Sequence, residues 1–257
     1  MKIAVAGGTG LLGSRVVGLA RERGHEVVVL ARSAGIDLLG GDAAARDRLV
    51  AALAGVDAVI DVSNVTTLKA DDAEAFFTAT TGHLLAAEQA AGVAHHVALS
   101  IVGVDRAPYG YYAGKVAQER AVEAGAVPWT ILRATQFHEF AGQMLDRLSV
   151  AGVHLAPNAR TQPVAAGEVA ARLVDLAEGE PAGRVPDLAG PREERLADMV
   201  RMLAKARGLR GPVVAVSLPG KQMQAMRRGD ALPGPGAQLG SQSYDEWVRT
   251  DAAAVAS

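Results

Sequence analysis

A phenol and an amine stand close together in the segment Y-G-Y-Y-A-G-K. Tyr111 lies four residues before Lys115 and Tyr112 lies three before it, so either ring would share a helix face with the amine. An ammonium beside a phenol lowers the pKa of the phenol, which could then donate a proton to a carbonyl oxygen as hydride arrives. Spacing does not choose between the tyrosines, and rings that simply pack on a helix are the alternative interpretation.

Two other side chains are candidates for proton transfer. Ser100 ends the apolar run HHVALS, at the sheet edge where open α/β folds bind ligands. His138 follows Phe137 at the start of an expected helix that could line the nicotinamide pocket, and an unperturbed imidazole titrates near pH ~6.5. Capping or core packing is the commoner role of such a histidine. His95 and His96 are adjacent and would point to opposite faces of a strand, so we expect no metal site.

Such chemistry needs a hydride source, and the N-terminal segment predicts how one is held. Residues 2–13 read KIAVAGGTGLLG, an apolar strand that runs into glycines and then into a helix. Gly7 can make the tight turn, Gly10 lets the backbone approach a pyrophosphate, and Gly13 lets the helix pack closely. The free N–H groups of the helix N-terminus favour an anion. We expect contacts from Gly7, Thr9, Gly10, Leu11, Leu12 and Gly13.

The end of the second expected strand indicates which dinucleotide binds. Sites for NAD place an acidic residue there, whereas an arginine accommodates the 2′-phosphate of NADP. Arg32 and Ser33 stand at this position, and a guanidinium beside a hydroxyl suits a phosphate. We therefore expect NADP(H), with NAD(H) as the alternative. Asp42 is expected to cap the following helix, rather than to lie near the adenine.

Short β-branched runs alternate with alanine-rich helical stretches in the first half of the chain, which predicts a doubly wound α/β fold with a parallel sheet. The expected strands are 2–6, 26–31, 36–39, 58–62, 96–100 and 129–132. The expected helices are 11–23, 43–54, 71–91, 112–123 and 137–150, then 168–177 and 196–206 in the second half.

The pattern changes after about residue 150, where proline and glycine become more frequent. We expect residues 1–150 to form an NAD(P)-binding Rossmann core and residues 151–257 a smaller substrate-binding lobe within the same domain. The turn-rich stretch 229–243 is long for a compact domain and is expected to be functional or mobile, for example as a cover over a substrate pocket. Met199 with Met202, and Met223 with Met226, could line an apolar pocket, although core packing is the more common role.

Composition narrows the classes of protein. The chain of 257 residues has 26 Lys and Arg against 28 Asp and Glu, and no cysteine. Balanced charge argues against a nucleic-acid partner, and the absence of cysteine fits a reducing cytoplasm. No apolar run reaches the length of a membrane span, and the N-terminal apolar stretch is short for a signal peptide.

Several segments together resemble the atypical branch of the short-chain dehydrogenase/reductase superfamily, the NmrA-like NAD(P)-binding family. They are GGTGLLG at 7–13, ARS at 31–33, LSIVGVD at 99–105, YYAGKVAQE at 111–119 and WTILRATQFHEF at 129–140. The resemblance implies that NAD(P) lies along the strand ends with Lys115 near the nicotinamide ribose. Members of this branch often keep the lysine without the tyrosine's role. The remaining expected cofactor contacts are Ser63, Asn64, Ser100, Thr135, Gln136 and Phe137.

The expected function is NADPH-dependent reduction of a small carbonyl, enone or quinone-like substrate. A non-catalytic NADP(H) sensor of the NmrA-like type is the main alternative, favoured if no proton donor reaches the nicotinamide. Sugar-nucleotide epimerisation is a third hypothesis, but the second half of the chain has no basic cluster for a diphosphate. The pattern G-x-S-x-G of hydrolases is missing. Substrate identity stays open, as does the choice between monomer and homodimer.

Overall fold

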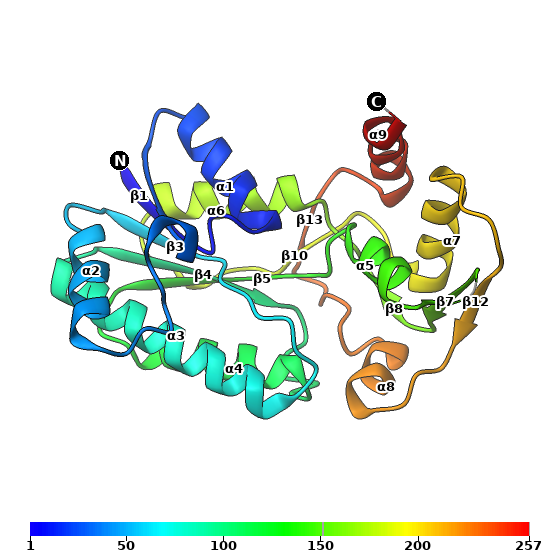
Figure 1. The fold of residues 1–257 in the computed structure, drawn as a ribbon, viewed down its shortest axis with the longest axis horizontal. Helices are drawn as coiled ribbons and strands as arrows, with labels where there is room; N and C mark the ends of the chain where they lie inside the picture. The colour runs from blue at the N-terminus through cyan, green and yellow to red at the C-terminus, as the bar shows by residue number, and fades with distance from the viewer. Residues whose placement is uncertain (151, 257) are drawn as a thin grey trace. The chain divides into compact units, whose positions relative to one another are not determined.

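The computed structural model describes residues 1–150 and 152–256. It divides into two compact units, each described by itself (Figure 1). Unit 1 contains residues 1–104, 108–133 and 167–185, and unit 2 contains residues 105–107, 134–166 and those from 186 onward. The units are therefore not consecutive halves of the sequence. No helix in the described part of the chain is both long enough and apolar enough to cross a membrane.

Unit 1 contains a parallel sheet in which β1 is flanked by β2 and β3, and β4, β5 and β9 follow in that order. Because the chain passes from β2 to the other side of β1, the carboxyl ends of β1 and β3 form the switch point where such sheets bind ligands. Apolar runs such as AVID are buried on both faces, as parallel strands require. The strands are β1 Lys2–Ala6, β2 Glu26–Leu30, β3 Ala58–Asp61, β4 His95–Ile101, β5 Trp129–Ala134 and β9 Gly183–Arg184.

Helices cover both faces of this sheet, as predicted for a doubly wound fold. Figure 1 shows α1 (Leu11–Glu22) and α6 (Ala166–Glu178) over one face and the other three helices of the unit over the opposite face. Arg23 joins the end of α1 to α6 through ion pairs to Asp175 and Glu178, at 2.7 and 2.9 Å. The helices of the opposite face are α2 Ala43–Ala52, α3 Ala70–Ala91 and α4 Tyr111–Ala124.

The expected strand at 36–39 is wrong. Gly35 takes a left-handed conformation with φ 78°, and the chain then forms a tight turn in which Gly40 donates to the Asp37 carbonyl. The Asp37 side chain also accepts the N–H of Leu39 at 3.0 Å, and such local side-chain bonds compete with a strand ladder. The apolar side chains that suggested a strand pack onto the core from this loop instead.

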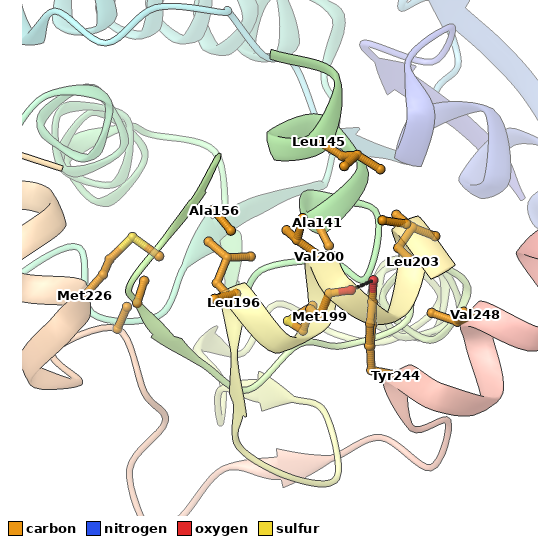
Figure 2. Close-up of a cluster of buried hydrophobic side chains, with 14 residues drawn as sticks. Ala141, Leu145, Ala156, Leu196, Met199, Val200, Leu203, Met226, Tyr244 and Val248 are labelled. Atoms are coloured by element: carbon orange, nitrogen blue, oxygen red, sulfur yellow. Dashed lines mark hydrogen bonds between the residues drawn. The ribbon is translucent and has the colours of Figure 1, made fainter. Parts of the chain in front are cut away.

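The described part of unit 2 is built from short strands and four helices around its own apolar core (Figure 2). Tyr244 is almost fully buried there and donates a hydrogen bond to the Met199 carbonyl at 3.1 Å. Met199 and Met226 are core residues, so the core interpretation of these two methionines is confirmed. The helices are α5 Phe140–Arg147, α7 Leu196–Ala206, α8 Lys221–Arg228 and α9 Tyr244–Ala256.

The strands of unit 2 are paired in small groups. In one sheet β7 lies between β12 and β6, β11 pairs antiparallel with β8, and β10 pairs with β13 and with Ala134 at the end of β5. Their bounds are β6 Ser149–Val150, β7 Val153–Pro157, β8 Arg160–Thr161, β10 Leu188–Ala189, β11 Glu194–Arg195, β12 Val213–Val216 and β13 Gln238–Leu239.

The expected helix at 137–150 is too long at both ends. Phe137 is bridged to Val164 in extended backbone, and His138 donates its N–H to the Val164 carbonyl, so α5 cannot begin before Phe140. At the other end Ser149 and Val150 pair with β7. Tertiary pairing therefore overrides the helical pattern at both ends.

Candidate functional site

The loop between β1 and α1 has a shape that depends on glycine. Gly7 has φ +77°, and a Cβ there would lie 2.8 Å from the Val62 carbonyl oxygen. A Cβ on Gly13 would lie 2.1 Å from the Gly7 carbonyl oxygen, far inside van der Waals contact. Gly10 precedes the helix as its N-cap and makes no side-chain cap, so the first turn of α1 offers N–H groups without intrahelical acceptors. Such a cradle fits a phosphate group.

Ser63 lies beside this loop, because its backbone is within 3 Å of the position that a Gly7 Cβ would occupy. The Ser63 hydroxyl is buried and finds no hydrogen-bond partner among the described residues, while its backbone N–H is held by Asp61 at 2.9 Å. A buried polar atom of this kind is expected to have a partner. The glycine cradle and this hydroxyl together fit the pyrophosphate part of a dinucleotide; Thr9 and Leu11 are exposed next to them, and Leu12 is buried.

Arg32 and Ser33 lie beyond the end of β2 in a short 3-10 turn, Arg32–Ala34, and both are exposed. Their side chains are accessible at the carboxyl edge of the sheet, where β2 neighbours β1. Asp42 accepts the N–H of Ala45 at 2.7 Å, which confirms its predicted role as the N-cap of α2. The phosphate role of Arg32 and Ser33 stays a prediction.

Lys115 lies on the buried face of α4, with 4% of its surface exposed. Its ammonium donates to the Leu99 carbonyl at 2.6 Å and to the side-chain oxygen of Gln118, and it lies 4.6 Å from the centre of the Phe77 ring. Burial lowers the pKa of Lys115 to about 8, although nearby carboxylates act in the opposite direction. The amine is therefore held at the carboxyl ends of β3 and β4, charged at neutral pH and close to its titration point.

The two tyrosines have different surroundings. The Tyr111 hydroxyl donates to the side-chain oxygen of Asn64 at 2.6 Å, and its ring makes edge contacts with Phe77 and Tyr112. Burial raises the pKa of Tyr111, so the sequence-based expectation of a lowered phenol pKa is wrong for this residue. Tyr112 is buried, with 4% of its surface exposed. Tyr111 is thus a protonated phenol at the same edge as Asn64.

Ser100 follows Leu99 at the end of β4 and is buried. On the same side of the unit, Glu119 receives two hydrogen bonds from Arg133, at 2.8 and 2.7 Å, and a third from Arg184 at 3.0 Å. Burial opposes the ionisation of Glu119, but these arginines prevail and lower its pKa. Arg133 therefore pairs with a buried carboxylate, and this pair orders the end of β5.

Three expected cofactor contacts belong to unit 2 and make bonds within it. The Thr135 hydroxyl donates to the Gln162 carbonyl at 2.6 Å, and the side-chain oxygen of Gln136 accepts from Thr161 at 2.8 Å. Phe137 lies in the bridge to Val164. These bonds fix the segment after β5, and its role beside a nicotinamide stays a prediction.

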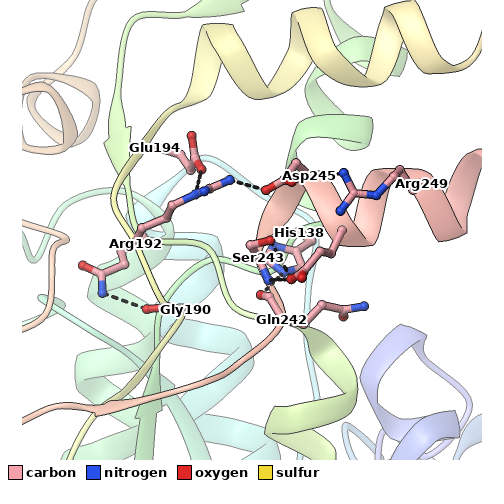
Figure 3. Close-up of polar contacts among 10 residues, drawn as sticks. His138, Gly190, Arg192, Glu194, Gln242, Ser243, Asp245 and Arg249 are labelled. Atoms are coloured by element: carbon pink, nitrogen blue, oxygen red, sulfur yellow. Dashed lines mark hydrogen bonds and ion pairs between the residues drawn. The ribbon is translucent and has the colours of Figure 1, made fainter.

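His138 is fully buried in unit 2, and its Nε2 donates to the Gln242 carbonyl at 3.1 Å (Figure 3). Its ring lies against Tyr244 and Trp247, with centroids 5.5 and 5.7 Å away. The histidine therefore anchors the end of the 229–243 stretch to the aromatic start of α9. Core packing describes these contacts, and proton donation by His138 stays a prediction.

The 229–243 stretch is fastened at several points within unit 2. Its residues Gln238 and Leu239 form β13, which pairs with β10. Arg106 donates to the carbonyls of Asp230 and Leu232, at 2.8 and 2.6 Å. A turn-rich composition therefore does not make this segment an unattached loop.

We expect Arg106→Ala to loosen the start of this stretch. Losing two hydrogen bonds from a charged donor costs about 1–2 kcal/mol of local stability on exposed backbone, which corresponds to a roughly 5- to 30-fold faster amide exchange at 229–232. Hydrogen exchange read by mass spectrometry measures this change. Arg120→Ala, an exposed arginine on α4 of unit 1, is the matched control, and equal exchange in both variants would contradict the anchoring role.

His95 and His96 have separate partners, as their adjacent positions predicted. His95 bonds to the Thr130 hydroxyl at 2.8 Å, whereas His96 is fully buried and contacts the carboxylate of Glu88 at 2.8 Å. Burial works against a charged imidazole, but Glu88 raises the pKa of His96. This ion pair joins β4 to α3 and stabilises the packing of the helix on the strand.

The sequence interpretation missed Asp61, Phe77 and Gln118. Asp61 ends β3 with 1% of its surface exposed, and its second oxygen accepts from the Gln118 amide at 2.8 Å. A carboxylate at the end of a buried strand was the available signal, since strand ends of this kind line ligand sites. The role of Gln118 has no such signal, because only the fold brings it to Asp61.

Comparisons with known proteins identify the family of this chain. A family model described as NAD(P)H-binding matches residues 7–179, so the chain belongs to the NAD(P)H-binding family. Its fold is the Rossmann-type fold of short-chain dehydrogenases and reductases. An NADPH-dependent quinone oxidoreductase from Escherichia coli, solved with NADPH, superposes with a TM-score of 0.72 at 18% identity over 96% of this chain and 99% of that one.

Two further proteins are similar to this chain, one in structure and one in sequence. A short-chain dehydrogenase/reductase superfamily protein from Agrobacterium tumefaciens with bound NAD has a TM-score of 0.70 at 20% identity, over 100% of this chain and 97% of that one. A protein of Streptomyces griseus subsp. griseus, (4-alkanoyl-5-oxo-2,5-dihydrofuran-3-yl)methyl phosphate reductase, is 33% identical over 145 residues, 52% of this chain and 48% of that protein. The matches span less than half the length of each curated relative.

Proposed function

We propose that this protein is an NADPH-dependent oxidoreductase that reduces a small carbonyl, enone or quinone-like compound. The observation that carries the proposal is the buried Lys115 ammonium, held at the carboxyl ends of β3 and β4 in the unit that contains the glycine cradle. A buried amine with a shifted pKa at the ligand edge of a sheet is typical of a functional site. The reductase name of the Streptomyces relative supports the same class of activity.

In this proposal, residues of unit 1 bind the cofactor and donate a proton. When bound, the reduced nicotinamide supplies the hydride. The glycine cradle and Ser63 hold the pyrophosphate, and Lys115 holds the nicotinamide ribose. Tyr111 is the proposed proton donor because Asn64 holds its hydroxyl at this sheet edge, although burial raises the pKa of the phenol and so makes it a weaker acid.

NADPH is the proposed cofactor, selected by Arg32 with Ser33. A charge-assisted hydrogen bond to a phosphate contributes about 1.5–3 kcal/mol, so Arg32→Ala should weaken NADPH binding roughly 10- to 100-fold and leave NADH binding unchanged. Titration followed by nicotinamide fluorescence measures both. Arg21→Ala, at the far end of α1, should change neither. Tighter binding of NADH than of NADPH by the wild type would remove Arg32 from this role.

The activity is tested with purified protein and NADPH against a panel of quinones, enones and ketones, by the absorbance of the reduced nicotinamide. The proposal expects oxidation of NADPH with at least one of these classes. Binding of NADPH without turnover of any compound would favour a non-catalytic NADP(H) sensor. Absence of NADPH and NADH binding would contradict both functions.

A further inference from the structure

We infer that Asp61 and Gln118 are positioning residues for Lys115, forming a buried hydrogen-bonded chain that fixes the direction of the ammonium and keeps it charged. The chain runs from the Asp61 carboxylate to the Gln118 amide nitrogen at 2.8 Å, and from the Gln118 oxygen to the ammonium. The inference deepens the proposed function, on which its importance for the cofactor site rests.

Asp61 determines which end of the Gln118 amide faces the lysine. A carboxylate only accepts hydrogen bonds, so Gln118 must present its NH2 group to Asp61 and its oxygen to Lys115. Without the carboxylate, the amide could turn and place its own donors against the ammonium. The position of the ammonium is then completed by the Leu99 carbonyl and the face of Phe77.

The charges around Lys115 also single out Asp61. Lys115 faces Asp61 from β3, Glu119 from its own helix, the Leu99 carbonyl from β4 and the Phe77 ring from α3. Glu119 is already balanced by two arginines, Arg133 and Arg184. Asp61 instead receives hydrogen bonds from the Ser63 N–H and the Gln118 amide, both neutral.

Asp61 is therefore the carboxylate whose charge offsets the burial of Lys115. Burial alone lowers the pKa of a lysine by several units; here Asp61 and Glu119 raise it, and the pKa is about 8. The Lys115 ammonium is therefore charged below pH about 8 and neutral above it. Removing Asp61 moves this midpoint to lower pH, whereas it leaves exposed lysines unchanged.

The test is a titration of the ammonium in the full chain without added cofactor. Protein labelled with ¹³C and ¹⁵N at the lysine side chains is titrated by NMR, and Lys115→Arg identifies the Lys115 signal. We expect a midpoint near pH 8 for Lys115 in the wild type, about one pH unit lower in Asp61→Asn. The other lysines serve as internal references: Lys2, Lys69, Lys205 and Lys221.

Two further variants keep the inference falsifiable. Gln118→Met removes the link at similar volume and should lower the midpoint in the same direction, even if Asp61→Asn does not fold. Glu123→Gln, an exposed carboxylate on the same helix that pairs with Arg184, is the matched control and should leave the midpoint unchanged. An unchanged Lys115 midpoint in a folded Asp61→Asn or Gln118→Met would overturn the inference. Because the readout uses no cofactor or substrate, it is independent of whether the protein is a reductase.

Discussion

Gly13→Ala is expected to abolish dinucleotide binding. The added Cβ would lie 2.1 Å from the Gly7 carbonyl oxygen and 2.7 Å from the Gly8 Cα, and these are backbone atoms that cannot turn away. The N-terminus of α1 must then move away from the loop, which disrupts the N–H groups that face the phosphates. Overpacking of this kind costs about 1–3 kcal/mol of stability, and we expect NADPH affinity to fall by at least about a hundredfold.

Gly18→Ala is the matched control for this change. Gly18 lies in the same helix, and nothing lies within 4 Å of the position that its Cβ would occupy. Alanine has the higher helix propensity, so this variant should be more stable by roughly 0.5–1 kcal/mol and bind NADPH as the wild type does. Calorimetry gives the affinities and thermal unfolding the stabilities. Wild-type affinity in a folded Gly13→Ala would show that the cradle does not hold the cofactor.

Lys115→Met is expected to slow the proposed reduction by about a hundredfold or more. Methionine keeps the length and apolar stem of the side chain but removes the ammonium, and misplacing a reactant by about 1 Å costs on the order of a hundredfold in rate. The measurement is single-turnover oxidation of bound NADPH by the best acceptor of the panel. Because methionine fills the buried site, circular dichroism should show an intact fold.

Lys2→Met provides the control for a lost lysine charge. Lys2 lies at the amino end of β1, at the opposite edge of the sheet, and pairs with the exposed Glu26 at 3.2 Å. Exposed pairs contribute no more than about 1 kcal/mol, so the rate of NADPH oxidation should not change. A folded Lys115→Met that turns over at the wild-type rate would remove Lys115 from the site.

The parts of the fold that depend on local pattern could be predicted from the sequence. An apolar strand, three glycines and an amphipathic helix in order are a continuous signal, and the structure has β1 and α1 at these residues. The segment 36–39 has the composition of a strand, but the turn bonds of Asp37 and the left-handed Gly35 decide its conformation. The segment 137–150 looks helical, yet its ends pair with distant strands.

Residues of the site could be predicted only where a local sequence pattern identifies them. Lys115 follows from its spacing to two tyrosines, whereas the link between Gln118 and Asp61 joins residues 57 positions apart, which no local pattern reveals. The prediction of a lowered pKa for Tyr111 was wrong because spacing along the sequence does not reveal burial or hydrogen-bond partners. Spacing placed an ammonium near the phenol, but burial raises the phenol pKa and the hydroxyl bonds to Asn64, while Lys115 donates to Leu99 and Gln118.

Transfer of hydride from a nicotinamide to a small acceptor by this protein is measured most directly with an isotope label. NADPH carrying deuterium on one face of nicotinamide C4 is incubated with the protein and a ketone or enone, whose product keeps the transferred hydride on carbon, and the product is analysed by mass spectrometry. If the protein transfers hydride, the product gains deuterium from one of the two labelled faces and not from the other. Tight binding of labelled NADPH without deuterium in any ketone or enone, and without oxidation of NADPH by any quinone, would contradict the reductase and leave the protein as a cofactor-binding sensor.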